Sequence, residues 1–84
     1  MILRILESET ASPYRLRLTF NNGTRKTVDV RPLLQGPVFE PLWDAAYFSL
    51  GRIDPISGTV VWPNGADFAP EALYELAALE SSAA

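Results

Sequence analysis

Residues 14–30, with the sequence Tyr-Arg-Leu-Arg-Leu-Thr-Phe-Asn-Asn-Gly-Thr-Arg-Lys-Thr-Val-Asp-Val, decide the fold of this chain. From Tyr14 to Phe20, apolar side chains alternate with polar ones, and this period of two is that of a half-buried β-strand. The alternation returns before Val30, after an Asn-Asn-Gly segment that is typical of a hairpin turn. The segment therefore predicts an antiparallel β-hairpin.

Two registers of this hairpin can be drawn, and they pair different side chains. A two-residue turn would place the apolar Phe20 opposite the charged Arg25. A three-residue loop, with Gly23 at its left-handed position, places Leu16 opposite Val28 instead. Because a slip of one residue inverts every side chain, the pattern favours the three-residue loop.

Three arginines, Arg15, Arg17 and Arg25, share the outward face of the hairpin in this register. Arg15 is then opposite Asp29, which predicts a cross-strand ion pair on a solvated face. The alternative interpretation is a docking stripe for an acidic partner or for nucleic acid. The solvated face is the favoured interpretation.

A first strand is predicted before this hairpin and a second hairpin after it. Ile2–Leu6 is apolar and rich in β-formers, whereas Glu7–Pro13 is polar and is expected to be a loop. Phe48–Ile53 and Thr59–Trp62 are predicted as strands. Asp54–Gly58 joins them with residues that favour a turn, and the pattern does not choose between a four- and a five-residue loop.

Short helices are predicted for much of the remainder. Three prolines and one glycine in residues 31–41 exclude a long regular element there. One helical turn is expected at Pro32–Leu34, and a short helix at Glu40–Ala46, with Leu42 and Trp43 pointing inward.

A C-terminal helix is predicted over Pro70–Ala78. Pro70 stands at the first helical position, where its missing N–H costs nothing, and Glu71 complements the helix dipole. Asp67 is expected to supply the N-terminal hydrogen-bond acceptor. The expected buried stripe consists of Leu73, Leu76 and Leu79.

This order of elements predicts an α+β fold. We expect a small antiparallel sheet of about five strands built from two hairpins, with a short helical insert and the C-terminal helix packed on one face. Eighty-four residues predict one domain, residues 1–84, with a frayed tail at Ser81–Ala84.

Composition removes several classes of function. The chain contains neither Cys nor His, so it lacks thiols, the commonest general base and the usual ligands of zinc. No run approaches the roughly 18 apolar residues of a transmembrane helix, and the start does not resemble a signal peptide. These features predict a cytoplasmic protein without membrane contact. With a net charge of −3, direct binding to nucleic acid is not expected.

One long segment resembles a known family. Gly58–Glu75, with the sequence Gly-Thr-Val-Val-Trp-Pro-Asn-Gly-Ala-Asp-Phe-Ala-Pro-Glu-Ala-Leu-Tyr-Glu, resembles the signature of the domain of unknown function 2442 family. Gly36–Leu42 and the Asp54-Pro55 turn are similar to the same family, so the resemblance covers nearly the whole chain. It implies an α+β fold in a small bacterial protein, but it implies no established function.

The resemblance also implies a genetic context. Family members resemble proteins encoded beside another small uncharacterised protein, an arrangement suggestive of toxin–antitoxin pairs. Some relatives join this domain to a helix-turn-helix domain. Residues 1–84 show no such domain, so direct DNA binding is not expected to carry over.

Two segments carry the candidate binding residues. In Trp62–Asp67, the structural interpretation is a core Trp62, a strand stop at Pro63 and a tight turn at Asn64-Gly65. The functional interpretation is a binding corner with polar contacts beside the Trp62 ring. The Gly36–Trp43 loop is the expected place for an apolar surface patch. Together the candidate residues are Pro37, Phe39, Trp43, Trp62, Pro63, Asn64, Gly65 and Asp67.

These features predict a non-catalytic protein-interaction module. Its partner is expected to be a protein, and by the resemblance the module would be the antitoxin-like or regulatory member of a pair. A domain that binds a small ligand at the Trp62–Asp67 corner is the alternative. A metal-dependent hydrolase built from Asp54, Asp67, Glu71 and Glu75 is disfavoured, because their spacing requires no such site. No catalytic residue, metal or cofactor is predicted, and open sheet edges are compatible with a homodimer.

Overall fold

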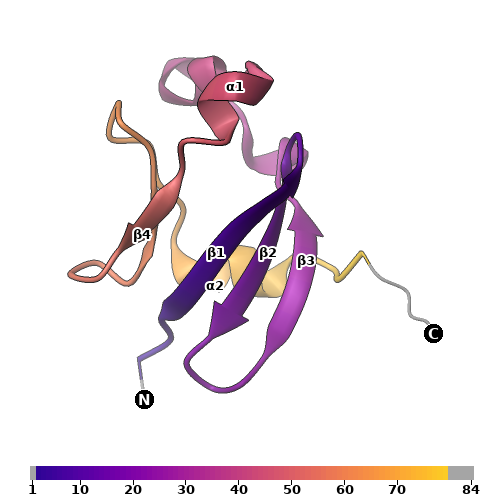
Figure 1. Ribbon diagram of the computed structural model, residues 1–84, viewed down its shortest axis with the longest axis vertical. Helices are drawn as coiled ribbons and strands as arrows, with labels where there is room; N and C mark the ends of the chain where they lie inside the picture. Colours follow the sequence, from indigo (N-terminus) through magenta and orange to yellow (C-terminus); the bar gives the residue numbers. More distant parts are fainter. Residues whose placement is uncertain (1, 80–84) are drawn as a thin grey trace.

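The computed structural model describes residues 2–79 and shows the predicted α+β fold. Its strands form a three-stranded antiparallel sheet, ordered β1-β2-β3, and a separate two-stranded sheet, β4-β5 (Figure 1). The strands are β1 (Ile5–Ser12), β2 (Arg15–Phe20), β3 (Arg25–Asp29), β4 (Arg52–Asp54) and β5 (Thr59–Val61). The short helices are η1 (Arg31–Leu33), η2 (Pro37–Trp43), α1 (Ala45–Phe48) and α2 (Pro70–Glu75), of which η1 and η2 are 3-10 helices.

The β2–β3 hairpin has the predicted register. Leu16 is paired with Val28, and both side chains are buried. The three-residue loop is closed where the Phe20 amide donates to the Thr24 carbonyl at 2.8 Å. Gly23 has a φ of +91°, which is the left-handed conformation that the loop requires.

The first strand, in contrast, was predicted in the wrong place. It covers Ile5–Ser12 rather than Ile2–Leu6, so most of the expected loop Glu7–Pro13 is strand. Polar residues form it because its main chain pairs with β2, where Ser8 lies opposite Leu18. Backbone pairing with a neighbour leaves little trace in side-chain polarity, so the hydrophobic pattern did not reveal this strand.

The turn between β1 and β2 holds an unusual residue. Tyr14 has a φ of +70°, a left-handed conformation that costs free energy for residues other than Gly. Its ring packs against Trp43 at 5.1 Å and Phe48 at 5.7 Å between centroids, and its hydroxyl donates to the Trp43 carbonyl. This packing offsets the strain and attaches the helical insert to the sheet.

The insert differs from the predicted helix Glu40–Ala46. The 3-10 helix η2 ends at Trp43, and α1 begins after Asp44, whose carboxylate caps it by accepting from the Ala46 amide at 3.1 Å. Leu42 is buried as predicted, but Trp43 remains 43% exposed. Adjacent residues of a helix point in different directions, so only one of them can face the core.

The second hairpin is shorter than predicted at its first strand. Phe48 ends α1, and β4 starts only at Arg52, so the predicted strand Phe48–Ile53 is wrong in its first half. The loop contains four residues, since Asp54 pairs directly with Thr59. Gly58, with a φ of +73°, closes it by donating to the Asp54 carbonyl at 2.7 Å.

The C-terminal helix is also shorter than the predicted Pro70–Ala78. It ends at Glu75, because Leu76 already has an extended backbone. Of the predicted stripe, Leu73 is buried, Leu76 is half-buried and Leu79 is 44% exposed. The helical period therefore stops before it can bring Leu79 inward. The predicted frayed tail, Ser81–Ala84, lies outside the described residues.

Asp67 does not cap this helix, contrary to the prediction. The cap position is Ala69, and no side chain accepts a hydrogen bond there. Asp67 instead faces Val61 across an isolated antiparallel bridge, which holds it along β5 and away from the helix start.

The core lies between the three-stranded sheet and α2, which covers one face of that sheet (Figure 1). The Ile5 amide donates to the Gly58 carbonyl at 2.8 Å and so joins the two sheets. Within residues 2–79, no helix is both long and apolar enough to cross a membrane. The buried apolar residues are Ile5, Leu16, Leu18, Phe20, Val28, Val30, Leu34, Leu42, Phe48, Val60, Trp62, Ala66, Phe68 and Leu73.

Trp62 connects the second hairpin to the insert. Its ring is 3% exposed, and its Nε1 donates to the Phe48 carbonyl at 2.9 Å. It also packs against the Phe48 and Phe68 rings, each 5.6 Å away between centroids. The Gly51 backbone lies so close to this ring that a Cβ there would be 2.7 Å from Trp62 Cε2.

Asp29 pairs with a different arginine from the one predicted. Arg15 is opposite Asp29 in the ladder, but the carboxylate binds Arg31, with 2.6 Å between Arg31 Nη2 and Asp29 Oδ2. Asp29 also accepts from the backbone amide of Arg31 at 2.9 Å. An arginine two residues away can satisfy both oxygens, whereas Arg15 acts only through its charge.

Asp29→Asn is expected to make the stability of the domain less sensitive to acid. Side-chain hydrogen bonds from Arg31 hold the pKa of the Asp29 carboxyl below its ordinary value. Its stabilising contribution is therefore complete above the unfolded pKa of about 4, and is lost as the pH falls through the lower folded pKa. Melting temperatures from about pH 6 to about pH 2 would show a shallower fall for the variant. Glu71→Gln, at an exposed site on α2, is the control. An Asp29→Asn protein as acid-sensitive as the wild type would contradict the assignment.

Gly51→Ala is expected to destabilise the domain by about 1–3 kcal/mol, because the new methyl group overlaps the Trp62 ring. Chemical denaturation would measure the change. The control is the same substitution in a Trp62→Phe background, where the smaller ring should reduce its cost. Equal costs in both backgrounds would show that contact with Trp62 is not the cause.

Candidate functional site

The turn after β5 is built as predicted. The Gly65 amide donates to the Trp62 carbonyl at 2.9 Å, and Gly65 has a φ of +89°. Asn64 Oδ1 accepts from the Ala66 amide at 3.0 Å, while Nδ2 donates to the Val38 carbonyl at 2.9 Å. Asn64 thus holds its own turn and ties it to η2, which is a structural role.

This hydrogen bond brings part of the Gly36–Trp43 segment to the Trp62 corner. Phe39 stacks on Phe68, with 5.0 Å between ring centroids and 3° between planes. Pro37 is exposed at the start of η2. The Trp43 ring packs on Tyr14 instead of on a residue of the corner. The eight candidate residues therefore do not share one set of contacts.

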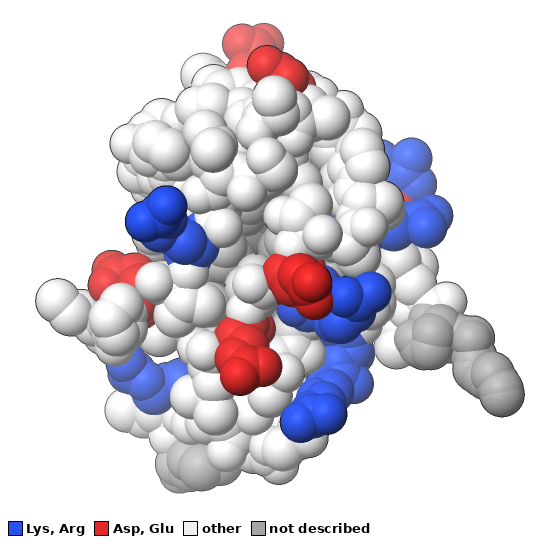
Figure 2. Space-filling model, viewed as in Figure 1, with Lys and Arg blue, Asp and Glu red and all other residues white. Residues whose placement is uncertain are grey.

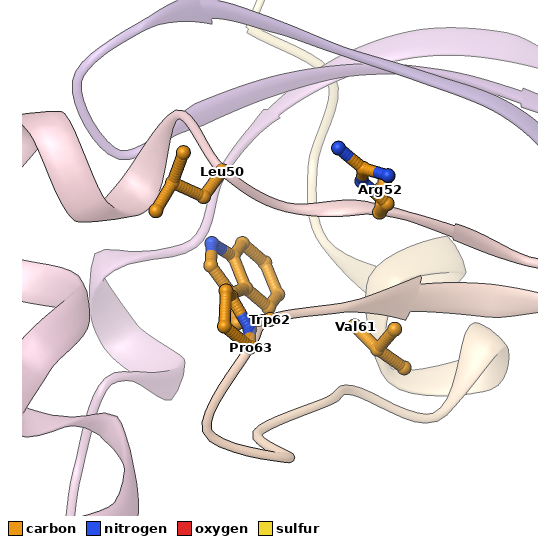
Figure 3. A pocket seen from close by; sticks show the side chains of 5 residues that line it. All are labelled: Leu50, Arg52, Val61, Trp62 and Pro63. Carbon is orange, nitrogen blue, oxygen red and sulfur yellow. The ribbon is translucent and has the colours of Figure 1, made fainter.

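A pocket of about 320 Å³ opens beside Trp62. It is lined by Leu50, Arg52, Val61, Trp62 and Pro63, and we call these five residues the Trp62 pocket. In Figure 3 the Trp62 ring lies between the side chains of Leu50 and Pro63, and Arg52 and Val61 come from the neighbouring strands β4 and β5. Four of its five side chains are apolar, so it is suited to an apolar group.

Sequence reasoning identified Trp62 and Pro63 but missed Leu50, Arg52 and Val61. Leu50 lies in the turn before β4, so no strand periodicity in the sequence relates it to Arg52. The partner residue Val61 required the pairing register of β4 and β5.

Charge is arranged asymmetrically around the pocket. Arg52 pairs with Val61 in the hairpin, and on its other side Val61 faces Asp67 across the isolated bridge. An apolar residue therefore lies between a basic and an acidic residue in the order of the strands. Within residues 2–79, Arg52 makes neither a hydrogen bond to a side chain nor an ion pair.

The acidic residues considered for a metal site are not brought together. The part of the chain that the structure describes contains no group of three or more Asp, Glu, His or Cys side chains that could hold a metal ion. Asp54 uses its carboxylate within its own turn, where it accepts from the Ile56 amide at 3.0 Å and from Ser57 Oγ at 3.1 Å.

The outer face of the three-stranded sheet carries both signs of charge. Figure 2 shows basic and acidic side chains next to each other over this sheet, whereas the surface over η2 and α1 is largely uncharged in this view. Arg17 forms an ion pair with Glu9 at 2.7 Å, between β2 and β1. The predicted arginine stripe is therefore partly neutralised by its neighbours.

Comparison with known proteins relates this fold to one solved structure and one family. A crystal structure described as that of a "putative DNA binding protein" from Nitrosomonas europaea ATCC 19718 matches with a TM-score of 0.78 and 28% sequence identity. The match covers 90% of this chain and 49% of that one, so the chain spans about half the length of the solved protein. No protein with curated function matches.

These comparisons correct one prediction and confirm another. The expectation that nucleic acid is not a direct partner is contradicted, since a structural relative is described as a "putative DNA binding protein". Neither comparison indicates a catalytic family. The family resemblance is confirmed, because a family model described as "Protein of unknown function (DUF2442)" matches residues 9–78. The chain belongs to this family of proteins of unknown function, DUF2442.

Proposed function

We propose that the chain is a non-catalytic binding module whose partner is a protein that docks over the Trp62 pocket. The observation that carries this proposal is an apolar pocket, open at the surface, on a rigid base. Its Trp62 base is fixed by the hydrogen bond to the Phe48 carbonyl and by two aromatic contacts. Preformed apolar pockets of this kind anchor single side chains at protein interfaces.

The exposure of the rim favours a protein over a small molecule. Leu50 is 49% exposed, and Arg52 and Pro63 are exposed as well. A small ligand in such an open pocket would stay largely in contact with water, whereas sites for small molecules enclose most of the ligand. A protein partner supplies the missing cover, because the surface around its anchor excludes water from the rim.

The chemistry of the lining supports binding rather than catalysis. Arg52 is the one ionisable group in the pocket, and arginine stays protonated, so it is a poor general acid or base.

The finer form of the proposal is that the chain is a regulatory or antitoxin-like subunit. It rests on the family resemblance, which implies a second small protein encoded beside this one.

Leu50→Ser is expected to abolish capture of the protein partner by the tagged domain from a lysate of its native cells, without lowering the melting temperature. The matched control is Ile56→Ser, because Ile56 is 88% exposed on the loop between β4 and β5 and does not line the pocket. Mass spectrometry of the captured proteins would make the comparison. Equal recovery of one stoichiometric partner with both variants would refute docking at the pocket.

Binding to nucleic acid is a second candidate, favoured by the description of the structural relative. In this chain the available phosphate contacts are Arg15, Arg17 and Arg25, on the exposed face of β2 and β3. Glu9 and Asp29 lie opposite Arg17 and Arg15 in the ladders and lower the positive potential of that face. Any affinity for phosphate is therefore expected to be weak, and with three arginines the slope of log affinity against log salt is expected to be at most about three in magnitude.

Fluorescence anisotropy with a labelled duplex at several salt concentrations would test this candidate. Arg15→Ala and Arg25→Ala are each expected to reduce the slope of log affinity against log salt by about one. Arg52→Ala, at the Trp62 pocket, is expected to leave the slope unchanged. Absence of binding at low salt, or equal slopes for all variants, would eliminate this face as the nucleic-acid interface.

A further inference from the structure

The Trp62 pocket combines an apolar cavity with a single guanidinium at its wall. Arg52 and Val61 are paired residues on adjacent strands, so their side chains emerge side by side on the same face. Both line the cavity, as does Leu50, which lies two residues before Arg52. A group that enters the cavity therefore lies within reach of the guanidinium.

Among the described residues, neither Asp54 nor Asp67 forms an ion pair with Arg52. Asp54, two residues along the same strand, uses its carboxylate oxygens in the Asp54–Gly58 turn. Asp67 is separated from Arg52 by β5, since it faces Val61 from the opposite side. The ion pairs among the described residues are Arg17–Glu9 and Arg31–Asp29, so Arg52 is available to a partner.

We propose that the Trp62 pocket recognises an acidic, apolar segment of the partner protein. A large apolar side chain fills the cavity against Leu50 and Trp62, and an Asp or Glu within one or two residues of it pairs with Arg52. This inference rests on the proposed function and specifies the chemistry of the partner. A guanidinium forms two parallel hydrogen bonds with a carboxylate, which makes this pairing stronger and more directional than contact with a neutral group.

Asp67 makes this recognition depend on the direction in which the partner segment binds. Arg52 and Asp67 pair with Val61 from opposite sides, so the two ends of a bound segment meet residues of opposite charge. An acidic residue at the Asp67 end would be repelled, whereas a basic or neutral residue would be accepted. The site thus selects segments that are acidic on one side only of the apolar anchor, because unfavourable charge contacts exclude other sequences.

Selection from a phage-displayed library of random peptides, followed by fluorescence polarisation with the selected peptides, tests the proposal. Wild-type protein should enrich peptides with a large apolar residue and an Asp or Glu close to it. Arg52→Glu should weaken these peptides about tenfold or more and should itself select Lys or Arg at the acidic position. Arg15→Glu, on the outer face of the three-stranded sheet, is the matched control and should select the same peptides as the wild type.

The outcomes separate this inference from the proposed function. Peptides that are lost with Leu50→Ser, but show no acidic preference and bind Arg52→Glu equally well, would overturn the inference and leave docking at the pocket intact. Peptides whose binding is unchanged by Leu50→Ser, or no enrichment of peptides at all, would overturn both the inference and the proposed function. A switch from acidic to basic peptides in Arg52→Glu alone would establish the pairing.

Discussion

The burial of the Trp62 ring is the constraint on which the rest of the structure depends. Its Nε1 hydrogen bond to the Phe48 carbonyl connects β5 to the helical insert, and its contact with Phe68 connects β5 to the segment before α2. A ring this large, placed at the end of a three-residue strand, leaves no room for a side chain at Gly51. The second hairpin by itself would be marginal, because two strands alone bury too little surface. Trp62 supplies the missing packing, and the same rigidity makes its ring a suitable base for a binding site.

Sequence patterns predicted the elements whose stability comes from buried side chains. The register of β2 and β3 follows from the period of two that buries Leu16 opposite Val28, together with the need for a glycine at Gly23. Sequence patterns failed for elements that depend on main-chain pairing or on contacts between residues distant in the sequence. The polar strand β1 exists because its backbone pairs with β2, and Tyr14 accepts a strained φ because its ring packs against residues of the insert. Neither cause is local, so no local pattern could reveal it.

The candidate site, like the fold, could be predicted from the sequence only in part. Trp62 and Pro63 stand out in the sequence because a tryptophan followed by proline at a strand end needs an explanation, and both line the pocket. Leu50 and Arg52 carry no such mark, and their role follows from the pairing of β4 with β5. For Asn64 the structure shows the structural interpretation at work, because its Oδ1 accepts from the Ala66 amide and its Nδ2 donates to the Val38 carbonyl. Its role in binding stays a prediction.

The distribution of charge separates the two surfaces that binding could use. On the three-stranded sheet, acidic residues stand beside outward arginines, as Glu9 does beside Arg17, so this face gains solubility without a strong field. At the Trp62 pocket Arg52 is the one charged residue of the lining and adjoins an apolar cavity, so the proposed partner would gain both burial and an ion pair in one place. The residues of one hairpin and the turns at its ends form this pocket completely. A partner that docks there therefore needs no contribution from the charged sheet, and the two surfaces can be altered independently.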